Sequence, residues 1–150
     1  MMAPASGKFT TFARAALLAA LVISGSLVAH RPAMAAAEAI AAANTANAGI
    51  KACSSNSGKA LYDCLANVLD RMSTELARAK APETQRALNA AASQLRSAVN
   101  KAQALSAIAQ CRAVVAGVMQ QLRAAGEKAL GLSAVAATLA QAARLIQSKG

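Results

Sequence analysis

Three cysteines are the residues of this chain with the greatest chemical potential, because thiols can form disulfides, bind metals or act as nucleophiles. They are Cys53, Cys64 and Cys111, and no two of them form a C-x-x-C motif. Their spacing matches neither a zinc-ligand set nor the thiol pair of a redox enzyme, so a thiol-based redox protein is the weakest of our hypotheses. In an oxidising compartment, three thiols predict one disulfide and one remaining thiol.

We expect the disulfide to join Cys53 to Cys64, because the two flank a Ser/Asn/Gly loop and close a short stretch of chain at low entropic cost. Cys64 with Cys111 is the competing pair, since both lie on apolar helix faces and a bridge there would constrain a longer loop. Cys53 with Cys111, or no bridge, are further alternatives. In the favoured pairing Cys111 is a buried, inert thiol. A reactive or intermolecular Cys111 is the functional alternative.

The acidic residues are scattered along the chain rather than gathered into one motif. Most lie three or four residues from a Lys or Arg, as in Lys59 and Asp63, Arg71 and Glu75, and Glu83 and Arg86. This spacing indicates ion pairs on helix surfaces rather than a catalytic pair of carboxylates. The chain also lacks a P-loop, a G-x-G-x-x-G and a G-x-S-x-G motif. We therefore expect a protein that is not an enzyme and that needs no metal and no cofactor.

The N-terminal segment has the three parts of a secretory signal peptide. Lys8 and Arg14 precede an apolar run over residues 15–29, and the small-residue motif Ala33-Met34-Ala35 follows. The run is shorter than the roughly 20 apolar residues that span a bilayer, and Ser and Gly interrupt it. We predict that residues 1–35 are a signal peptide cleaved after Ala35, with a retained anchor as the alternative. The expected location is the periplasm or the exterior of a bacterial cell.

Cleavage would change the composition of the chain that remains, residues 36–150. The whole sequence has 16 basic and 6 acidic residues. Loss of Lys8, Arg14 and Arg31 leaves 13 basic and 6 acidic, a net charge of +7. The remaining part contains no Trp, Phe or His and a single aromatic residue, Tyr62. Without His, acid–base catalysis near neutral pH loses its commonest group, and without aromatic side chains a nucleic-acid partner is not expected.

Hydrophobic periodicity predicts an all-α fold, a small bundle of three to four helices over residues 59–150. Residues 36–58 are expected to form an Ala-rich marginal helix or mobile arm followed by a loop, because alanine favours helix but offers little area for packing. The first confident helix, residues 59–80, ends before Pro82. Its apolar face consists of Leu61, Cys64, Leu65, Val68, Leu69, Met72 and Leu76.

Residues 83–125 contain no strong breaker, yet the apolar stripe changes sides between about Gln103 and Ile108. Either the helix breaks there and the chain forms a compact bundle, or it stays straight and two neighbours cover opposite sides. The straight form would leave thin two-helix interfaces and implies a dimer. We favour the compact bundle as a monomer. A final helix over residues 132–148 presents Leu132, Val135, Leu139, Ala142, Ala143 and Ile146.

Two patterns in residues 101–123 concern binding. Lys101, Arg112 and Arg123 are spaced by eleven residues, which aligns them along one side of a helix. Such a row suits an anionic surface, although it also suits the solvated border of an ordinary core face. Ala109, Ala113 and Gly117 stand four residues apart, on the side opposite the Val/Leu/Met face of the same stretch. This row either admits a closely packed helix or is simply an Ala-rich surface.

The sequence thus predicts an exported, non-enzymatic helical interaction or structural protein of the bacterial cell envelope, with a protein partner in the envelope. The alternative is a basic protein that associates peripherally with an anionic membrane or envelope polymer through Lys101, Arg112 and Arg123.

Overall fold

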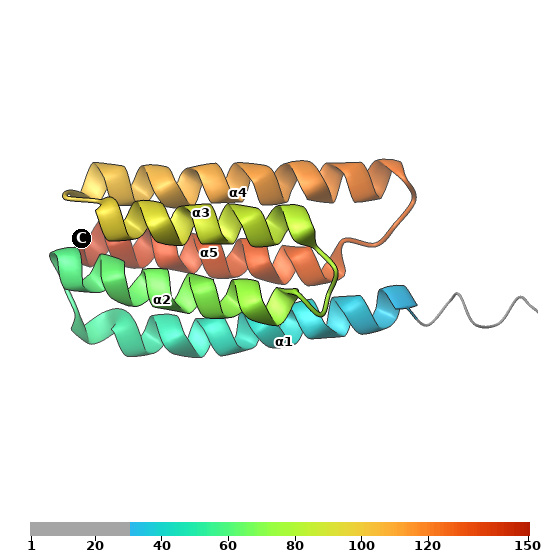
Figure 1. Ribbon diagram of the computed structural model, residues 1–150, viewed down its shortest axis with the longest axis horizontal. Helices are drawn as coiled ribbons and strands as arrows, with labels where there is room; N and C mark the ends of the chain where they lie inside the picture. The colour runs from blue at the N-terminus through green and yellow to red at the C-terminus, as the bar shows by residue number, and fades with distance from the viewer. Residues whose placement is uncertain (1–30) are drawn as a thin grey trace, which may run out of the picture.

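The computed structural model describes residues 31–150, which form five α-helices and one short 3-10 helix without any strand. The elements are α1 (Arg31–Ala52), η1 (Cys53–Ser55), α2 (Gly58–Leu76), α3 (Pro82–Ser97), α4 (Lys101–Ala124) and α5 (Leu130–Lys149) (Figure 1). The all-α prediction is confirmed. The bundle has five helices instead of the predicted three to four, because α1 joins the four helices of the predicted bundle region. The first 30 residues of the predicted signal peptide lie outside the described part.

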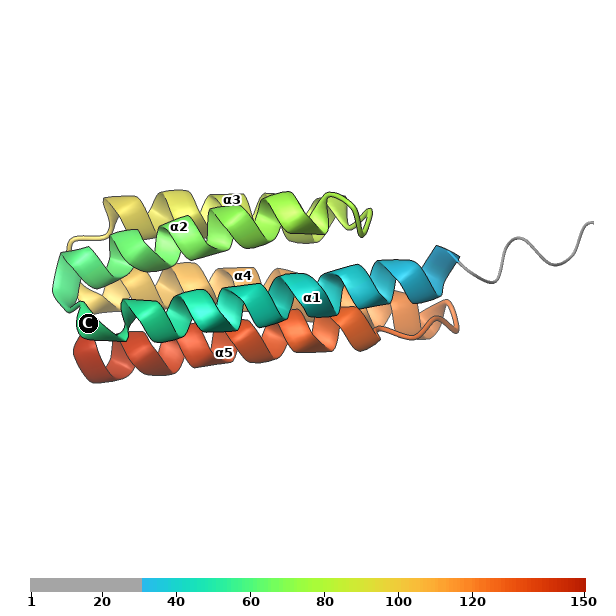
Figure 2. The same ribbon diagram turned by 90° about the horizontal axis from the view of Figure 1, so that it is seen from below.

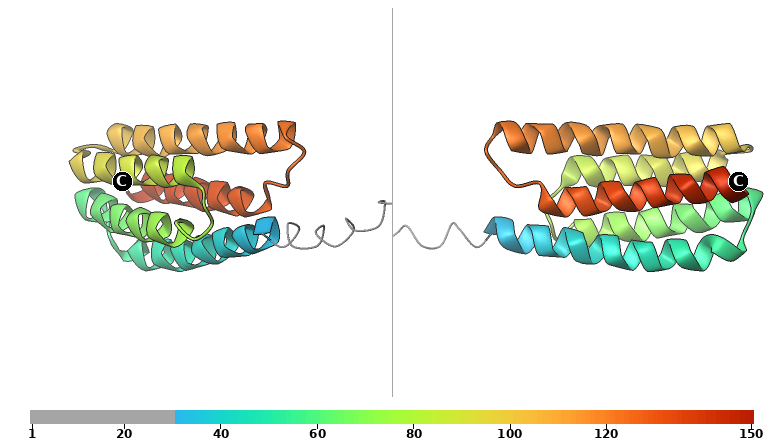
Figure 3. Two further views of the ribbon diagram at one scale, coloured as in Figure 1. Left: turned by 45° about the vertical axis from the view of Figure 1, so that its right-hand side comes forward. Right: turned by 180° about the vertical axis from the view of Figure 1, so that it is seen from behind.

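The five helices form a closed ring around one core. Each helix packs against the next along the chain, and α1 packs against α5 to close the ring (Figures 1 and 2). Successive helices are antiparallel, and because the number of helices is odd, α1 and α5 run parallel to each other (Figure 3). Contacts at both ends of this pair agree, since Gly131 lies against Ala36 and Lys149 bonds the carbonyl of Ser54.

The apolar face predicted for residues 59–80 is the centre of the core. Its large side chains Leu61, Leu65, Leu69, Met72 and Leu76 are all buried in α2. The helix ends at Leu76, four residues earlier than predicted, and a turn over residues 77–80 leads to Pro82 at the first position of α3. Pro suits this position because its fixed φ matches the helix and its missing N–H has no intrahelical acceptor to bond.

A break at residues 98–100 separates α3 from α4, which confirms the compact bundle and excludes the straight helix. Ala98 has extended backbone, with φ −65° and ψ 125°. The Asn100 side chain then caps α4 by accepting a hydrogen bond from the Gln103 backbone N–H at 2.9 Å. In return the Gln103 Oε1 accepts from the Val99 N–H at 2.9 Å, so the break satisfies its own backbone groups.

The apolar stripe changes sides because the chain breaks here between α3 and α4. The break lies at a different position from the one we expected. We expected it between about Gln103 and Ile108, and it comes a few residues earlier. Val99 is 80% exposed because it lies in this connection. The face of α4 is then continuous from its first turn. It consists of Ala104, Ala107, Ile108, Cys111 and Val115.

α1 is the main departure from the sequence analysis. Residues expected to form a marginal helix or mobile arm belong to a 22-residue helix that is part of the core. Its buried side chains are Ala39, Ala42, Ala43, Ala46 and Ile50. Small side chains stabilise this helix because they let neighbouring backbones approach and make many close contacts.

Two glycines show how close that approach is. A Cβ atom on Gly49 would stand 2.8 Å from Val68 Cγ2 of α2, and one on Gly131 of α5 would stand 2.7 Å from the Ala39 Cβ. Both distances are shorter than Cβ atoms tolerate, so α1 fits between α2 and α5 through residues without side chains. Gly131 lies in the first turn of α5.

Candidate functional site

The structure places Cys53 and Cys64 in the disulfide that the sequence analysis favoured. Their Cα atoms are 5.8 Å apart and the bond joins η1 to α2 across the loop at residues 56–57. Cys111 is the free cysteine and is 2% exposed on the core face of α4. Burial raises the pKa of the Cys111 thiol to about 12, because the charged thiolate would lose its hydration. This thiol has neither the exposure nor the thiolate character of a reactive cysteine.

Two of the described carboxylates, Asp63 and Asp70, form ion pairs on the surface. Lys59 pairs with Asp63 one turn later on α2, as expected, and Arg96 of α3 pairs with Asp70 of α2. No ion pair joins the other two predicted couples within residues 31–150. In the same range, no three His, Cys, Asp or Glu side chains stand close enough to hold a metal ion.

The three predicted surface cations all lie on α4 but not in one cluster. Each is separated from the next by eleven residues, or about 16 Å along the helix axis. Lys101 is held to α5, where its ammonium donates to the Gln147 carbonyl at 3.0 Å. Arg112 and Arg123 are exposed and make no ion pair in the described part of the chain. The structure thus presents a row of positive charge rather than a pocket.

The outward face of α4 is small and exposed. Ala109 and Ala113 are exposed, and a Cβ on Gly117 would meet nothing within 4 Å. Within the described part of the chain, therefore, no other helix packs closely on the row of Ala109, Ala113 and Gly117. Of the described helices, α4 alone is long and apolar enough to cross a membrane by length and composition, and 28% of that stretch is buried. Val114, at 43% exposure, is the one large apolar side chain exposed on α4.

Charge is distributed unevenly between the two hairpins of the bundle. α2 and α3 carry four basic residues (Lys59, Arg71, Arg86, Arg96) and four acidic ones (Asp63, Asp70, Glu75, Glu83). α4 and α5 carry five basic residues (Lys101, Arg112, Arg123, Arg144, Lys149) and no acidic one. The helices of the α4–α5 hairpin therefore form a positive side of the molecule, and those of the α2–α3 hairpin are neutral.

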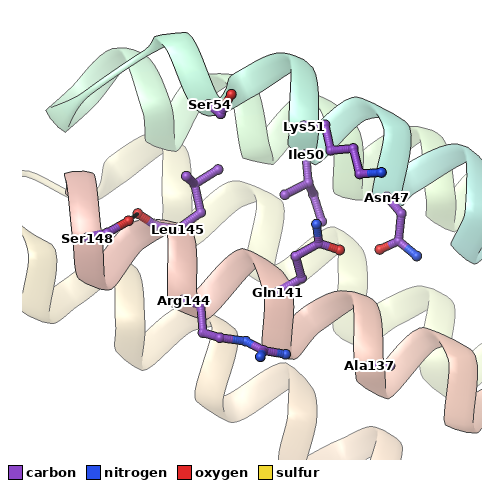
Figure 4. Close-up of a pocket in the computed structure, with 9 residues that line it drawn as sticks. All are labelled: Asn47, Ile50, Lys51, Ser54, Ala137, Gln141, Arg144, Leu145 and Ser148. Atoms are coloured by element: carbon purple, nitrogen blue, oxygen red, sulfur yellow. Dashed lines mark hydrogen bonds between the residues drawn. The ribbon is translucent and has the colours of Figure 1, made fainter.

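A groove of about 650 Å³ lies between the C-terminal halves of α1 and α5 (Figure 4). Apolar side chains form its base, with Ile50 fully buried and Leu145 partly buried. Polar side chains line the rest, and none of the lining residues is acidic. They are Asn47, Lys51, Ser54, Gln141, Arg144 and Ser148. We refer to this feature as the α1–α5 groove.

Three polar side chains of the α1–α5 groove extend toward one another. Figure 4 shows Lys51 and Asn47 of α1 and Gln141 of α5 directed at the same part of the groove. The Oδ1 atom of Asn47 is buried and accepts no hydrogen bond. Arg144 instead lies along α5, where its Nε donates to the Ala140 carbonyl at 3.4 Å. The groove thus combines an ammonium, two amides and an unpaired acceptor.

Sequence reasoning missed this groove, although part of its signal was present. Gln141, Arg144 and Ser148 recur at three- and four-residue steps, which marks one polar face of the final helix. Asn47 and Lys51 are likewise one turn apart. Nothing in the sequence shows that these two faces meet, because their pairing depends on the closure of the ring by α1 and α5.

Comparisons with protein-family models, with curated proteins and with solved structures find no match to this chain.

Proposed function

We propose that this protein is an exported, non-enzymatic helical interaction protein of the bacterial cell envelope that binds a partner through the α4–α5 side of its bundle. The observation that carries the proposal is the charge difference between the two hairpins. The described ion pairs lie on α2 and α3, whereas Arg112 and Arg123 of α4 remain without a carboxylate partner. Exposed cations that the fold does not use favour an acidic partner.

An acidic envelope protein is the partner we favour. The exposed residues of α4 are small or polar apart from Val114, so this helix would bury little large apolar area in a lipid surface. A partner helix, in contrast, can pack closely on a surface of small side chains, and Gly117 leaves open space for it. Peripheral association with an anionic membrane or polymer is the second candidate, supported by the length and apolar composition of α4.

The packing of α1 supports export with cleavage after Ala35. Met34 is 66% exposed, whereas the first buried residue of the helix is Ala39. Among residues 33–35, the part of the predicted signal peptide whose side chains are described, none is buried in the core. The chain that begins at Ala36 keeps the contact between α1 and Gly131 of α5.

Site-specific photo-crosslinking tests the proposed side of the bundle. A photoreactive residue in place of Ala113 on α4 should give adducts with an envelope protein in living cells. The same residue in place of Ala90, which is exposed on the neutral helix α3, should give few adducts. Adducts with lipid at position 113 would favour the second candidate. Equal labelling at both positions would contradict a binding role for α4.

A charge-matched pair of variants tests the contribution of the cations. Replacement of Lys101, Arg112 and Arg123 by Gln should abolish the adducts at position 113 and any binding to anionic vesicles. Replacement of Arg71, Arg78 and Arg86 by Gln removes the same charge from the other hairpin and its turn and should change neither. Salt of about 0.5 M should release the partner, because the screening length is then well below 10 Å. Binding that survives both treatments would refute the charge mechanism.

A further inference from the structure

The peptide bond between Ala35 and Ala36, where cleavage is proposed above, lies inside a helix. α1 begins at Arg31, so this bond is in the second turn of α1 rather than in an extended segment. In an α-helix the carbonyl of residue 35 accepts a hydrogen bond from the N–H of residue 39, and Ala39 is 3% exposed. The carbonyl of the bond to be cut is therefore tied to a turn of helix that belongs to the core.

Close packing against α5 holds this turn in place. A Cβ atom on Gly131 would stand 2.7 Å from the Ala39 Cβ, 2.9 Å from the Ala36 carbonyl oxygen and 3.1 Å from the Ala36 Cα. The first turn of α5 thus lies directly against the backbone of Ala36, at the end of the bundle where both helices begin (Figure 2). Ala35 and Ala36 are half-buried and line a pocket of about 400 Å³ at this end.

A peptidase needs a different backbone at the bond that it cuts. Extended peptides are recognised through main-chain N–H and C=O groups, which a helix bonds internally. Cleavage of a folded chain therefore proceeds through local opening, at a rate set by the population of the opened form. Helix ends open readily, but α1 continues for five residues before Ala36, and Ala36 itself is packed against Gly131.

From these contacts we propose that closure of the bundle by α5 protects the bond between Ala35 and Ala36, so that a signal peptidase cuts the chain only before the ring has closed. Hydrolysis adds one water across this amide and leaves a carboxylate on Ala35 and an ammonium on Ala36. A chain that folds first keeps residues 1–35 as a protected precursor. The proposal rests on the cleavage after Ala35 proposed above.

Digestion of the purified precursor, residues 1–150, by a signal peptidase in detergent solution tests the protection. A peptide of residues 10–45, which is too short to form the bundle, should be cut after Ala35. The folded precursor should be cut at the same bond at least about tenfold more slowly. A folded precursor that is cut as fast as the peptide would overturn the protection and leave the cleavage site intact. A peptide that is not cut after Ala35 would overturn the cleavage site and the protection together.

Two glycine variants of the precursor test the contact with α5. Gly131→Ala should speed cleavage of the folded precursor at least about fivefold, because the added Cβ displaces the backbone of Ala36. Gly117→Ala, whose Cβ would meet nothing within 4 Å, should leave the rate unchanged. Hydrogen exchange at the amide of Leu69, which is completely buried in α2, should stay slow in both variants and so report an intact bundle.

Two results with these variants would contradict the assigned contact. Equal cleavage rates for Gly131→Ala and Gly117→Ala would exclude the packing of α5 on Ala36 as the cause of protection. A faster cleavage of Gly131→Ala that is matched by equally faster exchange at Leu69 would show that unfolding of the whole bundle exposes the bond. The comparison of precursor and peptide uses no variant, so it decides the protection even where Gly131→Ala does not fold.

Discussion

The two hairpins of the bundle use polar side chains in opposite ways. Between α2 and α3, Arg96 binds both Asp70 and Asn67, and Ser73 and Gln85 exchange hydrogen bonds with each other's backbone at 3.1 and 3.3 Å. Between α4 and α5, the described side-chain hydrogen bond is that of Lys101 to the Gln147 carbonyl. The first hairpin therefore pairs two of the four basic residues on its helices with carboxylates, whereas the helices of the second carry no carboxylate that could pair with their basic residues. Charged side chains without a carboxylate partner in the fold indicate a surface that is available for binding.

The largest expected effect on the free energy of unfolding comes from truncating a buried apolar side chain of the α2–α3 hairpin, compared with an exposed one of the α4–α5 hairpin. Leu69 of α2 is completely buried, so Leu69→Ala should lower the free energy of unfolding by about 2–5 kcal/mol. Val114 on the outer side of α4 is 43% exposed, and Val114→Ala should change it by no more than about 0.5 kcal/mol. Chemical denaturation of both variants measures the difference. A large, concentration-dependent loss for Val114→Ala would mean that a second copy covers α4.

The disulfide distinguishes the N-terminal part of the bundle from the α4–α5 hairpin, which has no covalent link. Double substitution of Cys53 and Cys64 by Ala should lower the free energy of unfolding by about 2–3 kcal/mol, as expected for a loop closed over a separation of 11 residues. Denaturation with and without reductant provides the measurement. Reductant should destabilise the parent chain and have no effect on the double variant. A parent chain that is insensitive to reductant would argue against the bond.

The smallest expected effect concerns the surface charges themselves. Arg96→Gln removes the ion pair with Asp70, but both side chains are about two-fifths exposed, so the loss should be at most about 1 kcal/mol and should shrink in salt. Arg123→Gln should leave the free energy of unfolding unchanged, because Arg123 makes no described contact with a carboxylate. Denaturation at low and high salt compares the two. An equal loss of unfolding free energy for Arg96→Gln and Arg123→Gln would contradict the difference in charge pairing between the two hairpins.

Large side chains explain what could be predicted from the sequence. The Leu, Met and Ile residues of α2 and α5 recur at helical spacing, so their buried faces were predicted nearly residue by residue. The local Cys53–Cys64 pair was favoured for a similar reason, since its loop is short. Both features depend on residues close together in the sequence, where periodicity and loop length carry the information.

The features that could not be predicted depend on close approach between distant segments. The packing of α1 was underestimated because it was judged from the apolar area of large side chains. Alanine and glycine contribute instead by letting neighbouring helices approach closely. The end of α3 depends on the reciprocal bonds of Asn100 and Gln103, which resemble a capping box that periodicity does not detect. The α1–α5 groove requires two faces to meet that lie up to 95 residues apart.

The parallel contact of α1 with α5 has a consequence for the order in which the chain folds. A chain that is synthesised from its N-terminus releases α1 first and α5 last, so α1 must wait for the helix that closes the ring. During that time most chains of this kind would expose large apolar groups and risk aggregation. α1 exposes mainly alanine, with Ile50 as the one large side chain among its buried set. The small residues that permit close packing in the finished bundle thus also lower the risk that α1 aggregates before α5 has been synthesised.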